Sequence, residues 1–115
     1  MKILLVEDDG YVRDGLSIAL RTRAQLVETA SNYQEAIDAL NAQQFDVLVC
    51  DWQLGDPAGD GVGVARHAKK TGVQSILMVT ARDLDDLKGT SADVPIKAYL
   101  RKPVAIADLI SAIEA

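Results

Sequence analysis

The chain has 115 residues, 49% of them hydrophobic, and a formal net charge of −5 at pH 7. A chain of this length can bury about two-thirds of the surface that it exposes when unfolded, so we expect one domain over residues 1–115. The acidic balance argues against a general surface for nucleic acid or anionic membranes, because clustered Lys and Arg bind phosphate groups.

Two further features bear on the cellular setting. The single cysteine, Cys50, excludes a disulfide framework and zinc-ligand spacing, and a buried core role is expected for it. The N-terminal apolar run, Ile3 to Val6, is too short for a signal peptide or a membrane span. We therefore expect a cytoplasmic protein.

Short runs rich in Val, Ile and Leu recur along the chain and predict five strands buried on both faces. In chain order they are Lys2 to Val6, Gln25 to Thr29, Phe45 to Cys50, Ser75 to Val79 and Ile96 to Leu100. Segments with helical spacing lie between them and after the last one. Their apolar markers are Val12, Leu16, Ala19 and Leu20; Ala36, Ile37 and Leu40; Val62, Ala65 and Ala68; Leu84 and Leu87; and Ile106, Leu109, Ile110 and Ile113.

This alternation predicts a three-layer α/β domain, with a parallel sheet, right-handed crossovers and helices on both faces. In such sheets the ligand site lies at the carboxyl ends of the strands, where the strand order reverses. The residues that directly follow each predicted strand are therefore the candidates for chemistry.

Acids, a hydroxyl and a lysine occupy those positions. They are Glu7, Asp8 and Asp9, then Asp51, Thr80 and Lys102. If the first and third strands are neighbours, their acids converge on one cleft, and carboxylate oxygens suit Mg²⁺. Taken singly, each acid also has an ordinary explanation, as a helix N-terminal anion or a turn residue. The combination at four strand ends is not expected by chance.

The chain resembles the receiver domain of bacterial two-component response regulators. The segments that carry the resemblance are "ILLVEDD", "FDVLVCD", "ILMVTAR" and "AYLRKP". The resemblance implies a flavodoxin-like (βα)5 fold with the strand order 2-1-3-4-5. Because the chain ends soon after its last predicted helix, we expect a single receiver domain with no output domain in this chain.

The resemblance also implies a role for each acidic position. Asp51 would be the phosphoacceptor, attacking a histidine-bound phosphoryl group to form an acyl phosphate. Glu7 and Asp8 would hold Mg²⁺, together with Asp51 and the backbone carbonyl of Gln53. The metal would neutralise charge on the nucleophile and on the transferring group.

Other positions would sense or tune the phosphoryl group. Lys102 and Thr80 would each contact a phosphoryl oxygen, and Tyr99 would turn inward when Thr80 moves. Gln53 and Arg82, two positions past Asp51 and Thr80, would tune the phosphoryl lifetime.

The implied function is a phosphorylation-dependent switch that assists its own phosphorylation and dephosphorylation and is not otherwise an enzyme. The expected partners are a sensor histidine kinase or a histidine phosphotransfer protein, and a downstream effector domain or protein. The effector would read the face formed by the fourth helix, fifth strand and fifth helix. Homodimer formation on phosphorylation is a further expectation, whereas direct nucleic-acid or membrane binding is not.

The chain departs from the family pattern in two loops. "GDPAGDG", after Asp51, is about two residues longer than usual, with Gly55 where a proline is customary. A short helix is expected around Leu84 and Leu87 in place of the usual long fourth helix. Trp52 is expected to shield the site or contact a partner, and Asp9 to cap a helix or support the metal.

Three alternatives remain at this point. A haloacid dehalogenase-type phosphatase needs Asp-x-Asp after the first strand, where this chain has Glu7 and Asp9 at that spacing. A Toprim-like module needs Asp-x-Asp at the acceptor strand, and Asp51 is followed by Trp52 and Gln53. A phosphorylation-independent pseudo-receiver would bind partners without using Asp51.

Overall fold

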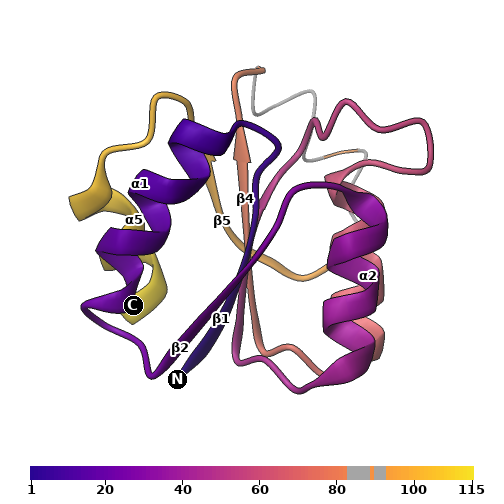
Figure 1. Cartoon of the computed structure of the whole chain (residues 1–115), viewed down its shortest axis with the longest axis horizontal. Coiled ribbons are helices and arrows are strands. Elements are labelled where there is room, and N and C mark those ends of the chain that lie inside the picture. Colours follow the sequence, from indigo (N-terminus) through magenta and orange to yellow (C-terminus); the bar gives the residue numbers. More distant parts are fainter. Residues whose placement is uncertain (83–88, 90–92) are drawn as a thin grey trace.

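Five parallel strands form one sheet in the order β2-β1-β3-β4-β5, with helices on both faces (Figure 1). The computed structural model describes residues 1–82, 89 and 93–115. The strands are β1 (Lys2–Val6), β2 (Leu26–Ala30), β3 (Val47–Asp51), β4 (Ser75–Thr80) and β5 (Ile96–Arg101). The helices are α1 (Gly10–Arg21), α2 (Tyr33–Ala42), α3 (Gly61–Lys70) and α5 (Ile106–Glu114). The predicted flavodoxin-like fold is confirmed.

The core divides into two clusters, one on each face of the sheet. Alternate side chains of a strand point to opposite faces, so Leu4 and Leu48 join the cluster under α2 and α3. Ile3 and Val49 join the cluster under α1 and α5. Strands buried on both faces explain the continuous apolar runs in the sequence.

The strand ends differ slightly from those predicted. β3 and β4 each extend one residue further, so Asp51 and Thr80 are the last residues of their strands. Backbone pairing continues one residue past the ends of β3 and β5, since the Trp52 N–H donates to the Val79 carbonyl (2.8 Å) and the Lys102 N–H to the Thr80 carbonyl (2.7 Å). β2 is shifted by one residue and β5 ends one residue later, at Arg101.

Side-chain caps fix where the helices begin at the carboxyl edge of the sheet. The Asp9 carboxylate accepts from the N–H groups of Tyr11 (2.9 Å) and Val12 (3.1 Å), so Asp9 is the N-cap of α1. Asn32 caps α2 by accepting from the Glu35 N–H. Asp60 caps α3.

The last two points concern the predicted fourth helix and helices that could span a membrane. The predicted fourth helix, marked by Leu84 and Leu87, lies outside the described residues. Within the part of the chain that the structure describes, no helix has the length and apolar character needed to span a bilayer.

Candidate functional site at the carboxyl edge of the sheet

Three acids meet at the carboxyl ends of β1 and β3, as predicted. These strands are neighbours in register, with Val6 beside Cys50, so the residues that follow them converge. Glu7, Asp8 and Asp51 each offer a carboxylate oxygen, and these oxygens all lie within 4.8 Å of one another. Three hard oxygen ligands in this arrangement fit a magnesium ion, which completes its octahedral shell with water.

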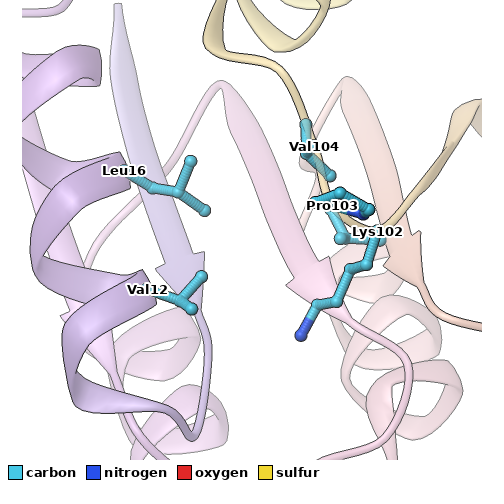
Figure 2. Close-up of a pocket in the computed structure, with 6 residues that line it drawn as sticks. Val12, Leu16, Lys102, Pro103 and Val104 are labelled. Atoms are coloured by element: carbon cyan, nitrogen blue, oxygen red, sulfur yellow. The ribbon is translucent and has the colours of Figure 1, made fainter.

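Lys102, which follows β5 at the same carboxyl edge of the sheet, bridges two of these acids. Its Nζ lies 2.8 Å from Glu7 Oε1 and 2.8 Å from Asp51 Oδ2. Burial alone would lower the pKa of Lys102, but its hydrogen bonds to Asp51 and Glu7 outweigh that effect, so the pKa is raised. The ammonium group therefore stays charged and partly neutralises the acids. Figure 2 shows its side chain extended from the end of β5.

Asp8 differs from the two acids held by Lys102. Its side chain is exposed, whereas Glu7 and Asp51 are only 2% and 6% exposed. Partial burial, a hydrogen bond with Glu7 and the charge of Glu7 all raise the pKa of Asp8. A negative charge on Asp8 is therefore disfavoured beside the charge of Glu7, and a divalent cation bound between the acids would relieve this repulsion.

The two carboxylate oxygens of Asp51 have different partners. Asp51 Oδ1 accepts weakly from the Gln53 N–H at 3.3 Å, while Oδ2 faces Lys102. Gly55 follows with φ of +61°, and a Cβ built on it would lie 3.6 Å from Asp8 Oδ2. This close neighbour of the acids was missed from sequence, although its glycine identity fits the left-handed backbone.

Thr80 lies at the end of β4, where it is 1% exposed. Its Oγ1 accepts from the Arg82 N–H at 3.0 Å, and the Arg82 side chain is exposed. Tyr99 pairs in register with Met78 and is half-buried against the core cluster under α2 and α3. Tyr99 therefore lies on the strand next to that of Thr80, two residues before Arg101, which is the register partner of Thr80.

The prediction for Trp52 is wrong. Its side chain is only 4% exposed and belongs to the core cluster under α2 and α3, together with Cys50 and Leu54. Alternation along an extended chain explains this, since Cys50, Trp52 and Leu54 point to the face opposite Asp51.

An apolar pocket adjoins the site at Lys102. It has a volume of about 400 Å³ and lies between α1 and the segment that follows β5. Figure 2 shows Val12 and Leu16 of α1 facing Pro103 and Val104 across it. The Lys102–Pro103 peptide bond is cis.

Comparisons with known proteins agree with this geometry. Residues 3–114 match the family described as response regulator receiver domain, and the chain therefore belongs to that family. The family's members are phosphorylation-dependent signalling domains of two-component systems.

Curated relatives are longer than this chain. Response regulator MprA from Mycobacterium avium is 35% identical over 116 residues, covering 100% of this chain and 50% of that protein. Transcriptional regulatory protein PmrA from Pectobacterium parmentieri is 32% identical, covering 100% and 51%. The chain thus spans about half the length of the curated relatives it matches.

Solved structures of similar domains superpose along nearly the whole chain. A CheY-like response regulator receiver domain protein from Methanospirillum hungatei has a TM-score of 0.87 at 27% identity, covering 98% of this chain and 90% of that one. The chemotaxis protein CheY4 of Vibrio cholerae has a TM-score of 0.85 at 26% identity, covering 98% and 95%.

Proposed function

We propose that this domain accepts a phosphoryl group on Asp51 and thereby switches a partner or output domain. The observation that carries the proposal is the buried Asp51 carboxylate, with a lysine ammonium 2.8 Å from one oxygen and two further acids beside it. A nucleophilic carboxylate, a cation and a metal-binding acid pair are the groups that phosphoryl transfer to a carboxylate requires.

Different residues of the chain have different roles in the phosphoryl transfer. An oxygen of Asp51 attacks phosphorus, the bond from phosphorus to the donor imidazole nitrogen breaks, and the nitrogen keeps the electron pair. Glu7, Asp8, Asp51 and the backbone carbonyl of Gln53 would hold Mg²⁺, which supplies charge neutralisation when bound. Lys102 pairs with the phosphoryl oxygens in place of Glu7 and Asp51. Hydrolysis of the acyl phosphate would reset the domain, at a rate tuned by the side chains of Gln53 and Arg82.

Thr80 and Tyr99 would carry the change to the surface. The Thr80 hydroxyl accepts from the Arg82 N–H, and its own hydrogen could be donated to a phosphoryl oxygen on Asp51 if the side chain moved toward that group. Movement of Thr80 would open space for the neighbouring Tyr99 ring, which is only half-buried. The altered face would include β5 and α5 and would be read by an effector or by a second copy of the domain.

The phosphoryl donor would be a sensor histidine kinase or a histidine phosphotransfer protein in the cytoplasm. A donor that reaches Asp51 must approach the carboxyl edge of the sheet, beside the apolar pocket. Exposed apolar side chains border this approach, with Tyr11 at 94%, Val12 at 40% and Ile106 at 46% exposure. These side chains would supply apolar contacts to the donor.

Intact-mass spectrometry tests the proposal. Wild-type protein incubated with acetyl phosphate and Mg²⁺ should gain the mass of one phosphoryl group, and omission of Mg²⁺ should abolish the gain. Asp51→Asn should show no gain. An equal gain in Asp51→Asn, or no Mg²⁺-dependent gain in wild type, would contradict the proposal.

A further inference from the structure

The loop after Asp51 is held to the start of α2 by a small set of contacts. Asp56 Oδ2 accepts from the Tyr33 backbone N–H at 3.0 Å, and Asp56 Oδ1 accepts from the Ala58 N–H at 2.9 Å. One carboxylate therefore both shapes the tip of the loop and satisfies an otherwise unpaired N–H in the first turn of α2.

The Tyr33 ring adds a steric contact to the same loop. A Cβ built on Gly59 would lie 2.5 Å from Tyr33 Cδ2 and Cε2, and one built on Gly63 would lie 3.0 Å from Cε2. The ring therefore packs directly on the backbone of Gly59 and close to that of Gly63. We call the Asp56 carboxylate and the Tyr33 residue, with Gly59 beneath its ring, the loop clasp.

The loop clasp is connected to the acidic site through one residue. Gly55 precedes Asp56 and lies against Asp8, with its virtual Cβ 3.6 Å from Asp8 Oδ2. Gln53, whose carbonyl would be a metal ligand, is two residues further back. A shift of Asp56 away from α2 therefore moves the wall of the site beside Asp8.

The glycines of this loop explain why it needs contacts to hold it in place. The loop between β3 and α3 contains Gly55, with φ of +61°, and Gly59. Glycine has more conformational freedom to lose on ordering than other residues. Contacts at the far end of the loop can replace the missing local stiffness.

We propose that Tyr33 and Asp56 are positioning residues for the Mg²⁺ and phosphoacceptor site, acting through the β3–α3 loop. This inference rests on the proposed function, in that the site they position is the one assigned there to Mg²⁺ and phosphoryl transfer. Neither residue touches the phosphoryl group; each keeps the Gln53 to Gly55 segment in place beside Asp8 and Asp51.

The test measures Mg²⁺ affinity by isothermal titration calorimetry on the unphosphorylated protein. Asp56→Ala removes the hydrogen bonds, whereas Tyr33→Ala and Gly59→Ala disturb the ring contact without changing any charge. Each variant should raise the Mg²⁺ dissociation constant about five-fold. Loss of one hydrogen bond or packing contact that holds the loop in place changes an equilibrium constant by about this factor. Tyr33→Phe keeps the ring and should bind Mg²⁺ like wild type.

Asn32→Ala is the matched control. The Asn32 side chain caps the same helix, and its hydrogen bonds within the described part of the chain are to Glu35 and not to the loop. The substitution therefore separates the stability of the helix from the position of the loop. Asn32→Ala should lower the melting temperature yet leave Mg²⁺ affinity unchanged. Unchanged affinity in Tyr33→Ala and Gly59→Ala, or equal weakening in Asn32→Ala, would overturn the inference.

Phosphorylation kinetics separate this inference from the proposed function. With acetyl phosphate, the loop-clasp variants should need more Mg²⁺ for half-maximal rate but approach the wild-type rate at saturation. If wild type takes up no phosphoryl group, the proposed function fails, and the calorimetric comparison still decides the role of the loop clasp.

Discussion

Replacing Lys102 with methionine removes the ammonium group that bridges Glu7 and Asp51 while keeping a long apolar side chain. Without it, three carboxylates remain with oxygens within 4.8 Å of one another. Two charges at about this separation repel by about 3 to 4 kcal/mol at an effective dielectric constant of about 20. The variant should therefore be less stable in the absence of a metal.

The size of the loss follows from the burial of the pair. Breaking a fully buried ion pair costs about 3 to 5 kcal/mol. The Lys102 side chain is 29% exposed, so solvent screening reduces this cost. We expect the free energy of unfolding of Lys102→Met to fall by about 2 to 3 kcal/mol in metal-free buffer. Because the pKa of Lys102 is raised from 10.5, the lysine stays charged throughout neutral pH, and its stabilising contribution is lost as the pH rises through that raised pKa.

Urea unfolding followed by the fluorescence of the buried Trp52 provides the assay, with EDTA or with Mg²⁺. Mg²⁺ should stabilise Lys102→Met more than wild type, because the lysine no longer competes with the metal for the same carboxylates. Lys70→Met, at an exposed lysine of α3, is the control and should stay within about 0.5 kcal/mol of wild type. Equal stability of Lys102→Met and wild type in EDTA would refute the electrostatic account of the site.

Two other predictions concern single carboxylates. The raised pKa of Asp8 means that its ionised form destabilises the metal-free fold at neutral pH, so Asp8→Asn should melt higher than wild type in EDTA and gain less from Mg²⁺. A lower melting temperature in EDTA would contradict this. Hydrogen bonds from the Ser31 backbone and hydroxyl lower the pKa of Glu35 from 4.5, so its contribution is present above that pH and lost as pH falls through the lowered pKa. Glu35→Gln should therefore melt lower than wild type at neutral pH, with a gap that narrows in acid; a pH-independent gap would refute the assignment.

The sheet and its acidic edge were predictable because parallel strands are buried on both faces. That burial produces continuous apolar runs, and the residue after each run lies at one edge of the sheet. The convergence of Glu7 and Asp51 needed only the assumption that β1 and β3 are neighbours. The roles of Lys102 and Thr80 came from the family resemblance.

Other features depend on contacts that sequence spacing does not specify. Proximity to Asp51 suggested a site role for Trp52, whereas backbone alternation turns its side chain to the opposite face and into the core. The hydrogen bond between Asp56 and Tyr33, 23 residues apart, appears only once α2 is placed beside the loop. The bridge from Lys102 to Glu7 spans 95 residues and likewise depends on the completed sheet.

The assignment of Asp51 as the phosphoacceptor is tested by identifying the residue that is modified. An acyl phosphate on an aspartate is reduced by borohydride to homoserine, which tandem mass spectrometry of the digested protein can locate. After incubation with acetyl phosphate and Mg²⁺, we expect homoserine at position 51 and none in the sample without Mg²⁺. Homoserine at position 8 or 9, or none at position 51, would contradict it.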